Sequence, residues 1–265
     1  MANTTKYKVE SGVQLLARLL KRTDNIENFY PALFETGPKS GETIEMFSQI
    51  SLNPLLTDLI CEALLPSKFG GPQLGVLLFS TDGNMDYNML FCCLKNKLLY
   101  KTHDIDNMEK FLHDVLSNLV ILKIYDATQF YTTINNIENI MMDYPHISLV
   151  IFHTLTAFYW SEQGFKITKM DFYIKNLLQL IKRVTKDYKI TLIYTRPEYF
   201  STNKDSTEDL EACSEHPSVD MVNYKIQLFH INDNCTKYKI NVKKINNLYV
   251  KYFNIQDKQL NWILE

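Results

Sequence analysis

Two polar residues follow strands whose apolar sequence predicts complete burial. His153 comes directly after the run Leu-Val-Ile-Phe at 149–152, and Asp82 follows a second apolar run at 76–79. Continuous apolar runs of this length are typical of parallel strands covered on both faces. If the two strands are neighbours, the pair is a candidate metal or acid–base site at one edge of the sheet.

The residue types at this position argue against nucleotide chemistry. Phosphate-binding α/β domains carry an Asp at such a strand end, whose carboxylate helps to hold Mg²⁺. His153 is a poor substitute because Mg²⁺ prefers hard oxygen ligands. A third metal ligand does not follow at helical or strand spacing. The favoured interpretation is a partly buried, hydrogen-bonded His153 beside an Asp-Gly turn at Asp82.

The segment at 48–54, before the first long helix, lacks the residues of a phosphate-binding loop. Such a loop reads G-x-x-x-x-G-K-[ST], because glycines let backbone N–H groups face the phosphates and Lys meets them. Here the segment is Ser-Gln-Ile-Ser-Leu-Asn-Pro, with neither Gly nor Lys. It predicts a plain connection into a helix capped by Asn53, with Pro54 as its first residue. A divergent nucleotide cradle is the alternative.

Strand and helix patterns alternate over most of the chain, which predicts a mainly parallel sheet covered on both faces. The N-terminal part, 1–41, is expected to be a short helix (11–22) and a linker, and 42–265 the core domain. Three further strands from residue 223 onward predict an antiparallel extension of the sheet. The expected strands are 43–47, 76–79, 120–125, 149–152 and 190–194, and the expected helices 53–65, 87–98, 108–119, 128–142 and 169–184.

The bulk properties are those of an ordinary globular protein. The chain has 265 residues, 46% hydrophobic and 22% charged, and a formal net charge of −2, which excludes a general attraction to nucleic acid or anionic membranes. No apolar run approaches the ~18–20 residues of a membrane span. Five cysteines without metal spacing predict reduced thiols in an intracellular protein.

The order and spacing of these elements resemble the RecA-like core of the recombinase-paralogue family. The resemblance is carried by Glu-Ser-Gly-Val-Gln-Leu-Leu-Ala-Arg-Leu at 10–19, Leu-Thr-Ala-Phe-Tyr-Trp at 155–160 and Asp-Tyr at 187–188. It covers about residues 10–195 and weakens in the C-terminal part. It implies a protein of homologous-recombination repair in the nucleus. It also implies a hetero-oligomer with a neighbouring paralogue, with DNA contacted as part of the complex and no membrane association.

Against this family's pattern, the nucleotide pocket is degenerate. Leu52 stands where the phosphate-binding Lys belongs, and Asn53 where a Ser or Thr belongs. Asp82 matches the carboxylate that orients the attacking water. The pocket around it, however, lacks both the Lys that would anchor the phosphates and the Asp that would bind the metal. We therefore expect no catalytic residue and no metal, and we expect ATP and Mg²⁺ to be absent or weakly bound. The expected vestigial pocket consists of Ser48, Ser51, Leu52, Asn53, Asp82 and His153.

Three surface segments are candidates for contacts with partners. Phe29 and Ala32 fit F-x-x-A, the short pattern by which family members dock on a neighbour's core, although Pro31 fits an ordinary linker as well. The loop at 196–220 stands where the resemblance places a DNA-facing loop. It carries seven acidic and two basic residues, a net charge of −5 that repels phosphates.

The third segment is a row of lysines near the C-terminus: Lys237, Lys239, Lys243 and Lys244. Alternation of the first three with apolar residues predicts lysines on one face of a strand and the core on the other. This row is either a solvated edge strand protected against pairing, which is favoured, or a surface that attracts DNA or an acidic partner.

The sequence thus predicts a RecA-like α/β domain that has lost its ATPase, a non-catalytic subunit of a paralogue complex. Two alternatives remain: a divergent nucleotide-dependent ATPase of the same fold, and a stand-alone module that binds single-stranded DNA through the lysine row.

Overall fold

A computed structural model of the chain describes most of the region from residue 26 onward. The described residues are 12, 26–27, 29–35, 37–101, 108–164, 169–198, 221–231, 237–244, 247–256 and 259–263. Outside them lie the helix expected over 11–22, Gly12 excepted, and residues 199–220 of the acidic loop expected over 196–220, whose first three residues are described.

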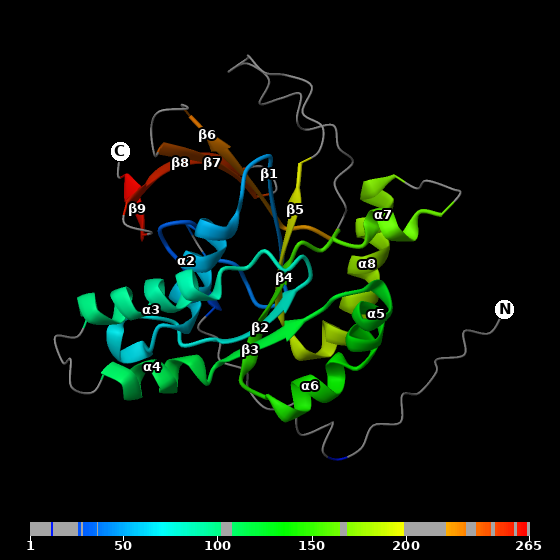
Figure 1. Cartoon of the computed structure of the whole chain (residues 1–265), viewed down its shortest axis with the longest axis horizontal. Coiled ribbons are helices and arrows are strands. Elements are labelled where there is room, and N and C mark those ends of the chain that lie inside the picture. The colour runs from blue at the N-terminus through cyan, green and yellow to red at the C-terminus, as the bar shows by residue number, and fades with distance from the viewer. Residues whose placement is uncertain are drawn as a thin grey trace.

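A single twisted sheet organises the fold (Figure 1), with nine strands in the order β3-β2-β4-β5-β1-β6-β7-β8-β9. The mixed α/β class and the C-terminal antiparallel extension are confirmed. The strands are β1 (Thr43–Ser48), β2 (Gly75–Ser80), β3 (Leu119–Lys123), β4 (Ile147–His153), β5 (Thr191–Pro197), β6 (Tyr224–His230), β7 (Lys237–Lys244), β8 (Asn247–Gln256) and β9 (Gln259–Ile263).

The C-terminal part differs from the expectation in two respects. It forms four strands where the sequence predicted three, and the first of them, β6, pairs parallel with β1. The antiparallel pairing begins between β6 and β7 and continues to β9. The strand that the sequence did not predict is β9, which pairs with β8. It has only five residues, and alternation of polar and apolar residues is a weak signal over so short a segment.

Helices cover both faces of the parallel strands, and each apolar strand contributes to two cores. Leu149 and Ile151 pack in one core with α2 (Asn53–Leu64), α3 (Tyr87–Lys101) and α4 (Met108–Leu116). Val150 and Phe152 pack in the other core with α5 (Ala127–Asn135), α6 (Ile137–Asp143) and α8 (Met170–Thr185). Because successive side chains of a strand point to opposite faces, burial on both sides requires the unbroken apolar run.

Shorter helical elements complete the chain, and one expected helix is divided. These elements are η2 (Ser67–Phe69), α7 (Tyr159–Glu162) and η3 (Lys186–Tyr188). The helix expected over 128–142 is two helices, because Asn136 ends α5 and precedes α6 with non-helical backbone angles. Asn favours helix ends, since its side chain competes with the backbone for hydrogen bonds.

The segment before β1 is irregular, as expected for a linker, but it is packed into the molecule. Phe29, Leu33 and Phe34 have no exposed surface and belong to the core that contains α2. Tyr224 of β6 donates a hydrogen bond to the carbonyl of Gly37. The boundary between 41 and 42 stays a prediction, and residues 29–34 pack as part of the same core. Among the described helices, none has the length and apolar character needed to cross a bilayer.

Candidate functional site

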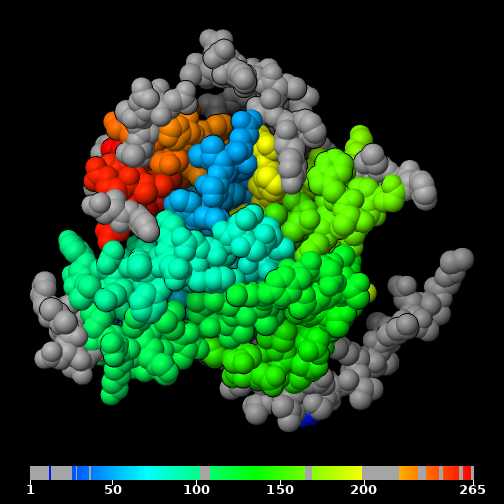
Figure 2. Space-filling view, in the orientation of Figure 1, coloured from blue at the N-terminus to red at the C-terminus, as the bar shows by residue number. Residues whose placement is uncertain are grey.

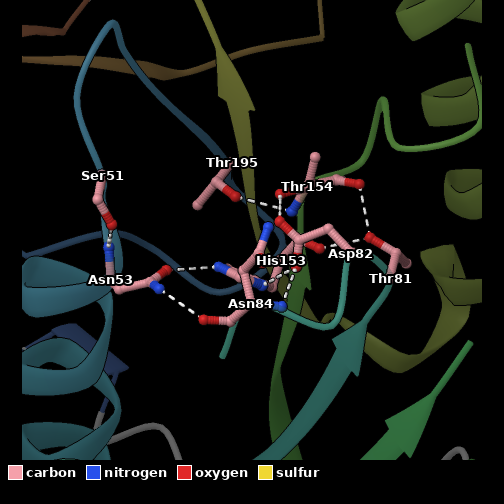
Figure 3. A network of polar contacts seen from close by, with 8 residues as sticks. All are labelled: Ser51, Asn53, Thr81, Asp82, Asn84, His153, Thr154 and Thr195. Carbon is pink, nitrogen blue, oxygen red and sulfur yellow. Dashed lines mark hydrogen bonds and ion pairs between the residues drawn. The ribbon is translucent and has the colours of Figure 1, made fainter. Parts of the chain in front are cut away.

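Polar side chains gather where β1, β2 and β4 end and α2 begins (Figure 3). Strands β2 and β4 are neighbours, and Ser80 of β2 is the register partner of His153. Asp82 follows β2, and Asn53 opens α2 directly beyond the end of β1. The structure therefore brings together Asn53, Asp82 and His153, three of the six residues expected to form the pocket, in direct contact.

His153 is the centre of this group. Its Nδ1 lies 2.9 Å from Oδ1 of Asp82, and its side chain is 4% exposed. On the other side of the ring, Nε2 lies 2.8 Å from Oδ1 of Asn53. The contact with Asp82 has the distance of an ion pair but not the direction of a well-aligned hydrogen bond. The predicted pairing of His153 with Asp82 is present, and Asn53 is a second partner that the sequence did not indicate.

The carboxylate of Asp82 is occupied by other donors as well. Its Oδ2 accepts a hydrogen bond from the Thr154 hydroxyl at 2.7 Å, and its Oδ1 accepts one from the backbone N–H of Asn84 at 3.0 Å. Burial raises the pKa of Asp82, but the close contact with His153 and the hydrogen bonds from Thr154 and the Asn84 backbone outweigh it and hold the pKa well below its usual value. The group is therefore an ionised, locally bonded carboxylate.

Asn53 does not cap its helix in the expected way. The N-cap position is Leu52, without a side-chain hydrogen bond, and Pro54 occupies the first turn. The amide of Asn53 instead faces the strand ends, where Nδ2 donates to the carbonyl of Asn84 at 2.7 Å and Oδ1 contacts His153. Asn53 thus links the start of α2 to the turns after β2 and β4, and the expected capping role is wrong.

The connection between β1 and α2 is a filled turn. Ser48 Oγ donates to the carbonyl of Leu228 and accepts from the N–H of Ile50, and Ser51 Oγ accepts from the N–H of Asn53 at 3.3 Å. Leu52, which stands at the place of the phosphate-binding Lys, is 8% exposed and belongs to the core. Two backbone N–H groups that a cradle would direct at an anion are therefore bonded within the turn.

Threonines around His153 were missed by sequence reasoning. Thr81 Oγ1 lies within hydrogen-bond distance of the carbonyls of His153 and Thr154, which share its one proton, and Thr195 Oγ1 accepts from the N–H of Thr154. Thr154 has φ +67, which is unusual for a β-branched residue. Its hydroxyl contact with Asp82 helps to hold it in this conformation. Thr-Leu-Thr after a buried strand carries no signal for such a turn.

The arrangement does not supply the ligands of a metal centre. Within the part of the chain that the structure describes, no group of three or more His, Cys, Asp or Glu side chains is placed to hold an ion. His153 and Asp82 contact each other, and the further neighbours Asn53 and Thr154 are bonded to them. Two surface hollows among the described residues, of about 260 and 760 Å³, are lined by other side chains.

The candidate docking pair lies on the inside of the molecule. Phe29 is fully buried against Phe34, with ring centroids 5.8 Å apart, and Ala32 is half-buried with its carbonyl bonded to Lys251. A side chain without exposed surface cannot serve as an anchor in a neighbour's pocket while this packing holds. The docking role of Phe29 and Ala32 is thus not supported by their placement.

The lysine row divides between two faces of β7. Lys237, Lys239 and Lys243 share one face, whereas Lys244 falls on the other, with its Nζ 4.7 Å from the centre of the Tyr224 ring. The interpretation of β7 as an edge strand is wrong, because it lies between β6 and β8. Protection against edge-to-edge pairing therefore does not explain these lysines.

The comparisons with known proteins agree with this architecture. The chain is 25% identical over 240 residues to the DNA repair protein XRCC2 of Mus musculus. The aligned region covers 88% of this chain and 84% of the relative. The chain is a distant homologue of XRCC2. No family model matches the chain.

Proposed function

We propose that this protein is a non-catalytic subunit of a recombinase-paralogue complex that acts in homologous-recombination repair in the nucleus. The observation that carries the proposal is His153 held between Asn53 and Asp82, at 2.8 and 2.9 Å. These contacts tie together the strand ends and the helix start where a nucleotide would need open donors and a metal ligand. The similarity to a DNA repair protein supports the assignment of this chain to DNA repair.

Two side chains at positions that serve phosphate transfer in the family's pattern, Asp82 and Leu52, are used for other contacts in this chain. Asp82 already accepts bonds from Thr154 and the Asn84 backbone and contacts His153, which leaves it fewer acceptor sites for a water molecule. Leu52 is packed in the core and supplies no positive charge. Restoring a pocket would require breaking several hydrogen bonds, each of which costs about 1–3 kcal/mol when a buried partner is left unpaired.

Equilibrium dialysis of the purified chain with labelled ATP and Mg²⁺ tests the non-catalytic assignment. We expect no saturable binding, with any dissociation constant weaker than about 1 mM. The matched variant is His153→Ala, which opens the network without adding a phosphate anchor and is expected to bind no better. Saturable micromolar binding by the wild-type protein, with hydrolysis that Asp82→Ala abolishes, would establish the divergent ATPase instead.

The partner assignment needs a separate experiment. Co-expression with the neighbouring paralogue from the same cells is expected to give a heterodimer that elutes as one species in size-exclusion chromatography. Pull-down from the source cells followed by mass spectrometry identifies the remaining subunits. Separate elution of the two chains, with no paralogue in the pull-down, would contradict the assignment even if nucleotide binding is absent.

A further inference from the structure

Residues 26–37, which we name the strap, fold into a compact loop ahead of β1. Gly37 has φ +61, and a Cβ at this position would overlap the carbonyl of Glu27, so the two ends of the strap touch. Among the described residues, the backbone hydrogen bonds of the strap are local, as are those from Leu33 and Phe34 to the carbonyl of Tyr30. A compact loop with adjoining ends is suited to open as a unit, because its own hydrogen bonds stay intact when it moves.

Side chains of the C-terminal strands hold the strap against the rest of the molecule. Tyr224 of β6 donates to the carbonyl of Gly37 at 2.9 Å, and Lys251 of β8 donates to the carbonyl of Ala32 at 2.7 Å. Figure 2 shows the C-terminal strands, in orange and red, at one end of the molecule. The position of the strap therefore depends on strands that lie at the opposite end of the sequence.

Tyr30 connects the strap directly to α2 and β9. Its hydroxyl donates a hydrogen bond to the buried carboxylate of Asp58 and accepts one from the indole N–H of Trp262 at 3.1 Å. The Trp262 ring also packs edge-on against the Tyr30 ring, with centroids 5.8 Å apart. Burial and the carboxylate of Asp58 raise the pKa of Tyr30, so its hydroxyl keeps the proton that it donates.

The backbone of Tyr30 is in a conformation that favours glycine. Its φ is +51, in the left-handed region, where the Cβ of an ordinary residue is crowded by the following carbonyl oxygen. Such a conformation persists only where the surroundings impose it. The bonds to Asp58 and Trp262 are part of those surroundings, so the closed strap is held against a local backbone preference and loss of these bonds favours opening.

Strand β9 is the element most easily released together with the strap. It has five residues, lies at the end of the strand order and pairs with β8. Short strands at a sheet edge open at lower free energy than central strands such as β4, which is buried along its whole length. Because Trp262 bonds to Tyr30, separation of either element removes a contact that stabilises the other.

We propose that the strap and β9 open together as one unit while the parallel strands stay folded, and that the Tyr30 hydroxyl is the contact that keeps both closed. Opening uncovers Phe29 and Phe34, which have no exposed surface in the closed state, together with the face of Trp262 that packs on Tyr30. The unit thus controls access to an apolar surface that the closed protein conceals. The inference does not depend on the proposed function, because it concerns this chain alone.

Hydrogen exchange of the full-length chain, followed by mass spectrometry of its peptides, tests the proposal. We expect the hydrogen-bonded amides of Leu33 and Phe34 and those that join β9 to β8 to be equally protected and less protected than β4. Tyr30→Phe removes only the hydroxyl and is expected to speed exchange on the order of tenfold in both the strap and β9. Exchange in β4 is expected to stay unchanged, which also shows that the variant is folded.

Two further variants separate this coupling from a general loss of stability. The matched control is Tyr131→Phe, which removes a hydroxyl bonded to the Glu162 carboxylate at 3.2 Å beside the other apolar core. It is expected to leave exchange in the strap and β9 unchanged. Trp262→Phe keeps an aromatic ring and removes the N–H that bonds to Tyr30, and it is expected to speed exchange in the strap as well as in β9.

Binding of the dye 1-anilinonaphthalene-8-sulfonate measures the uncovered apolar surface, and Tyr30→Phe is expected to bind more of it than wild type or Tyr131→Phe. Three results would overturn the proposal. The first is faster exchange of the strap in Tyr30→Phe with no change in β9, which means that the two open separately. The second is exchange of both segments at the rate of β4, which means that they open only with the whole domain. The third is unchanged exchange in both segments of Tyr30→Phe.

Discussion

His153 and Asn53 are a hundred positions apart in the chain, and their side chains meet at 2.8 Å across the carboxyl end of the sheet. Asn53 opens α2 and His153 ends β4, so this one contact connects the turn after β1 to the second strand beyond it in the sheet. Asp82 lies on the other side of the His153 ring. The end of β4, where a ligand could bind, is therefore occupied by contacts between side chains of the protein itself.

Replacement of His153 by Asp tests this link. The substitution places a second carboxylate beside Asp82 and removes the ring nitrogen that contacts Asn53. We expect a loss of about 1–3 kcal/mol in the free energy of unfolding, because buried polar groups are left unpaired and two like charges meet. Urea denaturation measures it. His153→Gln, which keeps an amide toward Asn53, is expected to lose less, and an unchanged stability of His153→Asp would contradict the assignment.

The carboxylate of Asp82 predicts a dependence of stability on pH. Its pKa in the folded protein lies below its usual value, so the ionised form stabilises the fold above the unfolded pKa of about 3.9. This contribution is lost as the pH falls through the acidic range below that value. The difference in unfolding free energy between wild type and Asp82→Asn is therefore expected to be constant near neutral pH and to shrink below about pH 4. A difference that grows on acidification would show that Asp82 is not stabilised in its charged form.

Phe29 distinguishes internal packing from docking on a neighbour. Because its ring is fully buried in this chain, Phe29→Ala is expected to cost about 3–5 kcal/mol in the isolated protein. The matched control is Phe172→Ala, whose ring is 57% exposed and whose loss is expected to stay within about 0.5 kcal/mol. If Phe29→Ala leaves the isolated chain as stable as wild type but prevents heterodimer formation, the F-x-x-A interpretation is correct.

An ion pair between Asp58 of α2 and Lys97 of α3 gives a further prediction. Lys97 Nζ lies 2.8 Å from Oδ1 of Asp58, which is almost fully buried and also accepts a hydrogen bond from Tyr30. Burial lowers the pKa of Lys97, but the nearby carboxylates of Asp58 and Glu62 outweigh it and raise the pKa above its usual value. Lys97→Met is expected to cost about 3 kcal/mol, since it leaves Asp58 without its cation.

A double-mutant cycle checks this pair. Asp58→Asn combined with Lys97→Met is expected to cost less than the sum of the single changes, because the combination removes both charges. Thermal unfolding of the four proteins measures the coupling. Additive losses would mean that Lys97 and Asp58 do not interact in solution.

Local patterns were sufficient for the parallel part of the fold. The run at 149–152 predicted a strand buried on both faces, and β4 sends Leu149 to one core and Val150 to the other. The sequence offered a contact between Asp82 and His153 only if their strands were neighbours, and the pairing of β2 with β4 supplies that condition. The similarity to XRCC2 confirms the family resemblance read from 155–160.

Other features depended on contacts that no local pattern contains. The amide of Asn53 turned away from the helix cap because His153 and the Asn84 carbonyl supplied partners from distant strands. The alternation of lysines and apolar residues in β7 is compatible with an edge strand or an interior strand. Only the pairing of β7 with both β6 and β8 decides between the two.

The sequence by itself determined the strands and helices of the parallel part, apart from the division of the helix expected over 128–142, and it determined which chemical groups are missing at 48–54. Periodicity and residue type act within a few residues of the chain, which is why they were sufficient there. The tertiary structure alone decided that Phe29 is internal, that Asn53 binds His153, and that Lys239 lies between two aromatic rings. Each of these depends on strand order and register, which are set by packing of the whole domain rather than by local preference.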